Sequence, residues 1–431
     1  MRTMLRLWFL TAVVLSASCS REEEKGPLPE VTITRPFSGF AAGYGDTLWV
    51  EAQISHTEKL DYVRVSLTGA NAIPVGAVQM FYPEGNSYSL QTFFVLDDRL
   101  LESGQLEVNV RAGSANGITN DWSTVGYTSI PVEFTSLLVV TGSGNAGYTV
   151  NSLPGEGNPQ PLFSFSGDYS GSAVSSRFRR FYKAGDVSGS FEAWNPDIRE
   201  LSWSFPAVST PPLPYFTAVY CDNTQVFAAI RGAFIQGYSA SGTLNFSSAG
   251  FGNGYFTSIV HYKQWIAAVF EPFNHCKSQL VLFNYPAGSI FRQTEFTGKA
   301  AALSGVSDGG LLVFVNGPED SSILQYSETQ NSIVRLRTFP YGTIRRVSMP
   351  EATNAFITTE SGVYWYRPES GSITGLIPEQ APHEVAWEPL TQQLFVAYGK
   401  HLRTFLLNDL SHPELVSFSD TIRDLHLMYT R

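Results

Sequence analysis

The chain has 431 residues and a formal net charge of −10 at pH 7, with 15% charged and 13% aromatic residues. This length favours two or three domains over a single core. The 37 glycines and 24 prolines indicate many turns, and the composition excludes disorder and coiled coils. Nucleic acid is disfavoured as a partner, because an acidic surface repels phosphate backbones.

The first 18 residues have the pattern of an export signal. Arg2 and Arg6 precede the apolar run 7–15, and the small residues 16–18 lead to Cys19. The run is too short to span a membrane. A cysteine directly after small residues resembles the lipobox of Bacteroidetes-type lipoproteins, although Leu15 lies one position earlier than the usual leucine. The resemblance implies that Cys19 is lipidated and anchors the protein to the outer membrane.

Residues 19–30 have the composition of a flexible tether, with acidic residues at 22–24 and Gly-Pro-Leu-Pro at 26–29. Two interpretations are open: a tether alone, or a tether that also resembles the acidic signal that sends such lipoproteins to the cell exterior. We favour the second.

Residues 31–135 contain strands with one buried face. Apolar and polar side chains alternate in 48–54, 62–67 and 106–111, and turn residues such as Asn116-Gly117 separate such segments. About a hundred residues of this kind predict a β-sandwich. The segment resembles the Ig-like or PKD-like spacers of cell-surface proteins.

Residues 136–431 contain a repeat of 38–45 residues. A short strand recurs around an apolar residue at 174, 219, 259, 303, 347, 385 and 425, and a more apolar strand follows six to nine residues later. In four repeats an aromatic residue then precedes an aliphatic one by seven positions: Trp194 and Leu201, Phe283 and Ile290, Tyr326 and Ile333, Tyr366 and Ile373. Repeats of this length with several short strands predict propeller blades.

The ends of this region complete each other. Segment 137–140 matches the second strand of a repeat but lacks a first strand, whereas 422–427 is a first strand with no second strand after it. This arrangement resembles the velcro closure of propellers. The predicted fold is therefore all-β, with an Ig-like β-sandwich followed by a seven-bladed β-propeller closed in this way.

Three consecutive repeats carry charge on the innermost strand, where the other four have Ala or Ser. The charged residues are Arg346, Glu384 and Asp424, and each follows another polar residue: Arg345, His383 and Arg423. One interpretation, which we favour, is a structural ion network beside the axial channel. The other is a polar pocket that binds a sugar or a charged small molecule.

A second candidate is the loop 271–276, which contains Phe273, Asn274 and His275, together with residues 316–320 of the next repeat. Aromatic and acidic side chains of such loops are suited to glycans but are also ordinary for an exposed loop. The repeat pattern puts Cys221 and Cys276 in connections on opposite faces of the ring, so both are expected to be free thiols. The seven histidines are scattered and no phosphate-binding glycine loop occurs, so no metal or cofactor is expected.

These patterns predict a surface lipoprotein that acts as a non-catalytic binding or scaffold module. Its expected partners are an outer-membrane protein complex or a polysaccharide. The alternative is a glycan- or ester-active hydrolase or lyase that uses Glu384 and Asp424. A pair of carboxyl groups facing one open cleft would favour the enzyme.

Overall fold

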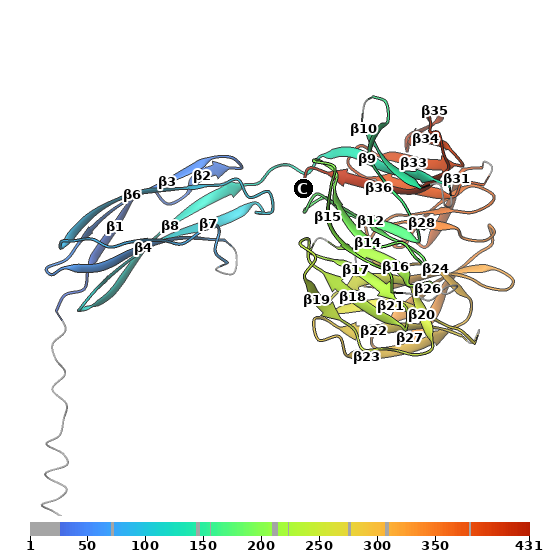
Figure 1. The fold of residues 1–431 in the computed structure, drawn as a ribbon, viewed down its shortest axis with the longest axis horizontal. Helices are drawn as coiled ribbons and strands as arrows, with labels where there is room; N and C mark the ends of the chain where they lie inside the picture. The colour runs from blue at the N-terminus through green and yellow to red at the C-terminus, as the bar shows by residue number, and fades with distance from the viewer. Residues whose placement is uncertain are drawn as a thin grey trace, which may run out of the picture. The chain divides into compact units, whose positions relative to one another are not determined.

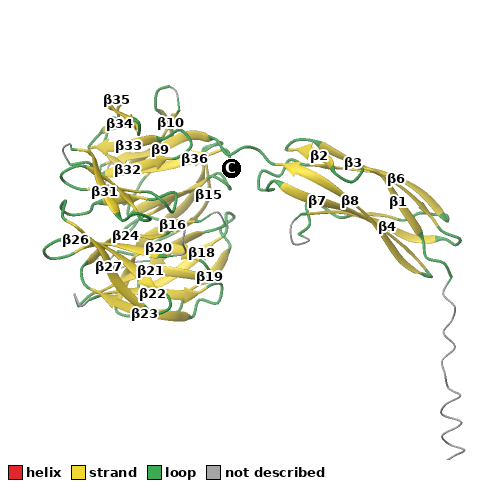
Figure 2. Cartoon of the chain, turned by 180° about the vertical axis from the view of Figure 1, so that it is seen from behind, coloured by secondary structure: helices red, strands yellow, loops and turns green. Residues whose placement is uncertain are grey.

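The computed structural model describes residues 26–69, 73–143, 147–155, 157–208, 214–222, 224–274, 277–306, 310–378 and 381–431. The chain divides into two compact units, Met1–Ile130 and Pro131–Arg431. Every element assigned in the described ranges is a β-strand (Figures 1 and 2). The predicted signal peptide, Cys19 and the first half of the tether lie outside these ranges. In the part of the chain that the structure describes, no helix has the length and hydropathy needed to cross a membrane.

The N-terminal unit consists of two sheets. One has the strand order β1-β3-β6 and the other β2-β8-β7-β4-β5, and only the β2–β8 pair is parallel. The strands are β1 (Glu30–Arg35), β2 (Phe40–Gly43), β3 (Thr47–Ser55), β4 (Leu60–Thr68), β5 (Gln79–Phe81), β6 (Ser87–Val95), β7 (Gly104–Ser114) and β8 (Gly117–Thr128). The three alternating segments predicted from the sequence lie in β3, β4 and β7.

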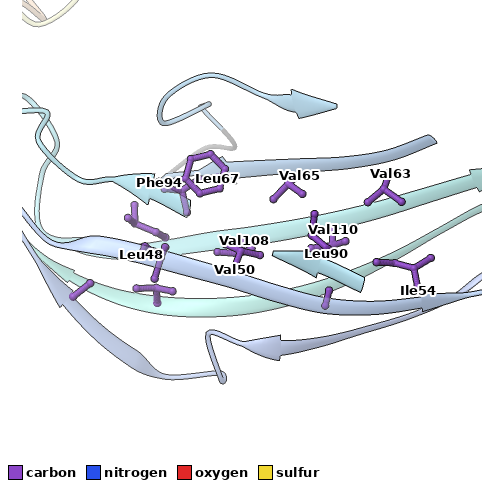
Figure 3. Close-up of a cluster of buried hydrophobic side chains, with 14 of the residues drawn as sticks. Leu48, Val50, Ile54, Val63, Val65, Leu67, Leu90, Phe94, Val108 and Val110 are labelled. Carbon is purple, nitrogen blue, oxygen red and sulfur yellow. The ribbon is translucent and has the colours of Figure 1, made fainter. Parts of the chain in front are cut away.

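Alternation of side chains builds the core of this unit. Val50, Val63 and Val108 are fully buried, and they come from strands of both sheets (Figure 3). Their neighbours on the opposite face are open to solvent, as Trp49 shows with 47% exposure. A two-residue period with one buried face is what a pair of packed sheets requires.

The C-terminal unit contains seven four-stranded antiparallel sheets within the described residues. Six sheets are made of consecutive strands, and in the seventh β36 pairs with β9. The strands are β9 (Phe134–Gly142), β10 (Tyr148–Pro154), β11 (Gln160–Phe165), β12 (Gly171–Ser175), β13 (Arg180–Ala184), β14 (Phe191–Asn195), β15 (Glu200–Phe205), β16 (Phe216–Cys221), β17 (Val226–Ile230), β18 (Phe234–Tyr238), β19 (Leu244–Ser247), β20 (Gly254–Tyr262), β21 (Trp265–Pro272), β22 (Ser278–Asn284), β23 (Ile290–Phe296), β24 (Lys299–Gly305), β25 (Leu311–Asn316), β26 (Ser321–Ser327), β27 (Ser332–Phe339), β28 (Arg346–Ser348), β29 (Ala355–Thr358), β30 (Val363–Arg367), β31 (Ser372–Ile377), β32 (Glu384–Glu388), β33 (Gln393–Tyr398), β34 (His401–Leu406), β35 (Asp409–Ser417) and β36 (Ile422–Tyr429).

The first strands of these sheets adjoin one another in chain order. β12 contacts β16, the relation continues through β20, β24, β28 and β32 to β36, and β36 contacts β12. From β12 to β32, each first strand pairs antiparallel with the strand that follows it in the chain, as the repeat predicted. Sheets of four short strands arranged in this way are β-propeller-like.

The two ends of the C-terminal unit form one sheet, as the sequence predicted. β36 pairs antiparallel with β9, with Leu425 opposite Val139 and Leu427 opposite Leu137 (Figure 1). This pairing gives β36 the partner that it lacks downstream. It also covers the free edge that β9 would otherwise expose.

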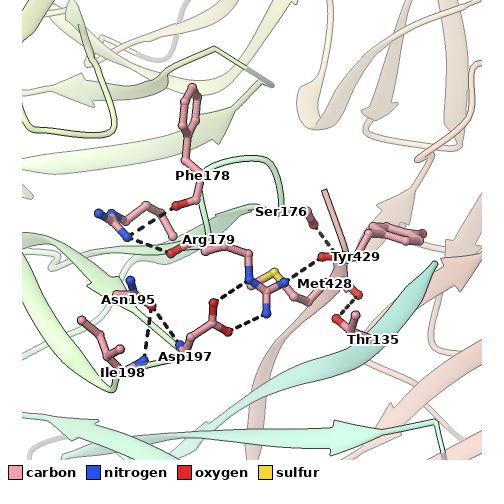
Figure 4. A network of polar contacts seen from close by, with 10 residues as sticks. Thr135, Ser176, Phe178, Arg179, Asn195, Asp197, Ile198, Met428 and Tyr429 are labelled. Atoms are coloured by element: carbon pink, nitrogen blue, oxygen red, sulfur yellow. Dashed lines mark hydrogen bonds and ion pairs between the residues drawn. The ribbon is translucent and has the colours of Figure 1, made fainter. Parts of the chain in front are cut away.

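Hydrogen bonds from neighbouring side chains fix the end of β36 (Figure 4). Arg179 holds Asp197 with two hydrogen bonds, of 2.8 and 2.6 Å, and donates a third from Nη1 to the carbonyl of Tyr429 at 2.7 Å. The Tyr429 backbone N–H donates to Ser176 Oγ at 2.9 Å, and Thr135 Oγ1 donates to the Met428 carbonyl at 2.9 Å. The end of β36 is therefore bonded to both the first and the second sheet of the unit.

The repeated aromatic and aliphatic residues face each other across the third and fourth strands of their sheets. Trp194 pairs with Leu201, Phe283 with Ile290, Tyr326 with Ile333 and Tyr366 with Ile373. Each of these sheets also shifts its register close to that pair. The seven-residue spacing therefore corresponds to a direct cross-strand pair on the two sides of the turn.

Candidate functional site

Three of the residues selected from the sequence lie on successive first strands. Arg346 begins β28, Glu384 begins β32 and Asp424 lies near the start of β36. The guanidinium Nε of Arg346 donates to Glu384 Oε1 at 2.6 Å. The Glu384 side chain is 9% exposed, while that of Arg346 is 50% exposed. The pair therefore has its carboxylate inside the protein and its cation facing solvent.

Asp424 is held by groups that the sequence did not single out. Its Oδ2 accepts hydrogen bonds from the Tyr169 hydroxyl at 2.9 Å and from Ser172 Oγ at 3.1 Å. His426 Nε2 lies 3.4 Å from the same oxygen and 2.6 Å from Ser172 Oγ. The hydroxyl oxygens of Tyr169 and Ser172 also lie within hydrogen-bonding distance of each other, so their two protons are shared among these three contacts. The carboxylate thus belongs to a network that joins β36 to β12 and to the residues just before it.

The pKa values of the two carboxyl groups shift in opposite directions. Burial raises the pKa of Glu384 to about 8, with Asp424 adding repulsion and Arg346 opposing both effects. Burial also acts to raise the pKa of Asp424, but the nearby His426, Arg346 and Tyr169 outweigh it and hold that pKa well below its usual value. Asp424 is therefore ionised at neutral pH, whereas Glu384 retains its proton more readily than an ordinary glutamate.

The three flanking polar residues are bonded elsewhere. Arg345 Nη2 contacts Glu360 at 3.1 Å, and His383 Nε2 lies 2.8 Å from the carbonyl of Ile422. Arg423 Nε donates to the Gly142 carbonyl at 2.9 Å. Alternation along a strand explains this, because consecutive side chains point to opposite faces. Two neighbouring groups make up the polar network: the ion pair of Arg346 and Glu384, and the bonded set of Asp424, His426, Tyr169 and Ser172. The two groups interact through their charges.

The second candidate loop is only partly described. Phe273 and Asn274 are exposed, and the ring of Phe273 lies 5.7 Å from that of Tyr255. His275 and Cys276 lie outside the described residues.

Cys221 is a free thiol at the end of β16. Burial raises the pKa of this thiol far above its usual value, and the neighbouring Asp222 adds to the shift. The thiolate is the reactive form, so the side chain is chemically quiet. The described ranges hold no group of three or more His, Cys, Asp or Glu residues that could bind a metal ion.

The comparisons with known proteins assign no family. No family model and no curated protein matches the chain. Among solved structures, it is similar to a quinonprotein alcohol dehydrogenase-like protein from Bacteroides thetaiotaomicron VPI-5482, with 10% identity and a TM-score of 0.45 over 93% of this chain and 97% of that one. It is also similar to the computationally designed Ika8 protein, with 10% identity and a TM-score of 0.47 over 68% of this chain and 91% of that one.

Proposed function

We propose that the chain is a lipoprotein anchored through Cys19 to the outer membrane and facing the cell exterior. Its modules would be an Ig-like β-sandwich and a seven-bladed β-propeller. The two sheets of the N-terminal unit and the cyclic contacts between first strands in the C-terminal unit support this interpretation. The lipid anchor has its support in the export signal and in the cysteine that follows it.

In this proposal the propeller is a non-catalytic binding or scaffold module for an outer-membrane protein complex or a polysaccharide. The observation that carries it is that both candidate carboxyl groups are already bonded to other side chains of the protein. Glu384 is paired with Arg346, and Asp424 is bonded to Tyr169, Ser172 and His426. Groups that are already bonded to the protein are suited to holding neighbouring strands together, and less suited to attacking a substrate.

A glycan- or ester-active hydrolase or lyase is the second candidate, and one observation favours it. The environments of Glu384 and Asp424 move their pKa values apart, the first upward and the second downward. A protonated acid beside an ionised carboxylate is the arrangement that glycosidic hydrolysis uses. The hydrogen bonds of Asp424 come from a tyrosine and a serine, and no arginine donates to it among the described contacts.

Activity measurements on isosteric variants separate the two candidates. Glu384→Gln and Asp424→Asn would be assayed beside the native protein on aryl glycosides, aryl esters and soluble polysaccharides. Glu360→Gln is the control, because Glu360 forms only an exposed pair with Arg345. The proposal predicts no turnover by any of the four proteins. Turnover by the native and control proteins that both network variants lose would establish the enzyme instead.

The anchor has its own test. Cells grown with an alkyne analogue of palmitate should incorporate it into the native protein and not into Cys19→Ala. The variant should leave the membrane fraction, because stable anchoring requires the acyl chains. Equal membrane retention of an unlabelled variant would contradict the proposed anchor.

A further inference from the structure

A second polar group lies in the C-terminal unit, apart from the network of Arg346 and Asp424. Asp222 follows β16 directly, and its Oδ2 lies 2.6 Å from Nδ1 of His261 on β20. The other oxygen, Oδ1, accepts hydrogen bonds from Thr224 and Gln225 at 2.6–2.7 Å. Burial opposes ionisation of Asp222, but the bonds from His261 and Thr224 outweigh it and lower its pKa. The carboxylate is therefore fixed in position and charged.

This contact determines which nitrogen of His261 is available. An ionised carboxylate only accepts hydrogen bonds, so Nδ1 carries the proton and the neutral ring keeps its lone pair on Nε2. The imidazole is also packed against the rings of Tyr285 and Phe227, with centroids 4.9 and 6.1 Å away. Among the described residues, Nε2 of His261 has no hydrogen-bond partner. The neutral His261 side chain is therefore fixed in orientation, and its Nε2 can accept a hydrogen bond from a ligand.

His261 lines a pocket of about 380 Å³. Most of the other lining side chains are aliphatic, among them Val260, Leu303, Val347 and Met349, and the hydroxyl-bearing Ser304 joins them. The His261 side chain is 23% exposed, so a ligand in the pocket can reach it. Tyr220 and the backbone add polar surface, so the pocket combines aliphatic side chains with polar groups, as small-molecule sites of this volume do.

We propose that this pocket binds a small, largely apolar molecule that bears a hydroxyl group and donates its proton in a hydrogen bond to Nε2 of His261. Asp222 would act as the positioning residue that orients the ring and holds the proton of the neutral imidazole on Nδ1. The aliphatic lining selects the apolar body of the ligand, and His261 selects the hydroxyl. The site goes beyond the proposed anchoring and scaffold function, and does not depend on it.

Two probes of matched shape test the proposal. p-Cresol and toluene differ by a single hydroxyl, and each would be titrated into the full-length protein at about pH 8, where an ordinary imidazole is neutral. We expect p-cresol to bind at least about tenfold more tightly than toluene, the equivalent of one hydrogen bond of about 1.4 kcal/mol. Equal affinities, or no binding of p-cresol at millimolar concentration, would overturn the proposal.

Variants and spectroscopy assign the effect to His261. His261→Phe should lose the preference for p-cresol and keep the affinity for toluene. His401→Phe is the control, since His401 lies on β34 and contacts Ser417 outside the pocket. If His261→Phe does not fold, ¹⁵N spectra of histidine-labelled native protein still decide: p-cresol should shift Nε2 of His261, and an unmoved resonance at saturation refutes the proposed contact.

Discussion

Removal of residues 422–431 should destabilise the C-terminal unit far more than the loss of an ordinary tail. Ile422, Leu425 and Met428 on β36 are 0%, 7% and 1% exposed. Burial of a side chain of this size stabilises a protein by about 1.5–3 kcal/mol, so the three together contribute about 5–9 kcal/mol. That sum is comparable to the total stability of a typical domain, about 5–15 kcal/mol. The truncation also uncovers the backbone edge of β9.

Thermal and urea unfolding of the chain ending at Thr421, followed by circular dichroism, measures this effect. Deletion of Arg431 alone is the control, because β36 ends at Tyr429. We expect the control to unfold like the native protein. We expect the truncated chain to be unfolded, or to melt at a much lower temperature with exposed apolar surface. A truncated chain with the native unfolding midpoint would show that the last strand does not close the unit.

Three further predictions concern single side chains. Glu192→Ala should destabilise the protein by about 3–5 kcal/mol, because it leaves the fully buried Lys183 ammonium without the carboxylate 3.2 Å away. Urea unfolding measures this loss, and an unchanged unfolding midpoint would contradict it. Burial opposes ionisation of Asp168, but backbone N–H groups of residues 187–189 outweigh burial and lower the pKa of this carboxyl to about 2. The ionised carboxylate therefore stabilises the fold above about pH 4, and this stabilisation is lost as the pH falls towards 2. Asp168→Asn should remove about 1–2 kcal/mol of that acid dependence, since solvent screens part of the interaction, and identical pH profiles refute it. Cys221 should react with iodoacetamide far more slowly in the native protein than in urea, and equal rates would show an open thiol.

The strand order could be predicted from the sequence because each repeat has apolar residues at corresponding positions. The seven apolar positions from 174 to 425 mark first strands that each need a partner. The last first strand, 422–427, has no strand after it, and 137–140 is the second strand that lacks a first strand, so the two were expected to pair. The seven-residue spacing of aromatic and aliphatic residues likewise has a direct structural cause in a cross-strand pair.

The polar network could be predicted only in part. Arg346, Glu384 and Asp424 stand out because charge replaces alanine or serine on three first strands. His426 could have been found, since it lies two positions after Asp424 and so shares its face of β36. Tyr169 and Ser172 could not, because their contact with Asp424 depends on the strand that joins the two ends of the unit.

The pair of Asp222 and His261 gave no signal in the sequence for a similar reason. The two residues are 39 positions apart on neighbouring repeats, and each is ordinary in its own segment. Scattered histidines are usually structural or exposed, and sequence alone gives no distance between adjacent sheets.

Exposure of the protein on intact cells tests the proposed surface function most directly. An epitope tag added after Arg431 would be probed with an antibody on unpermeabilised cells, for the native protein and for Cys19→Ala. We predict strong labelling of cells that carry the native protein, removal of that label by added protease, and little label for the variant. Native protein that is abundant in the membrane fraction but labelled only after permeabilisation would contradict a surface-anchored binding module.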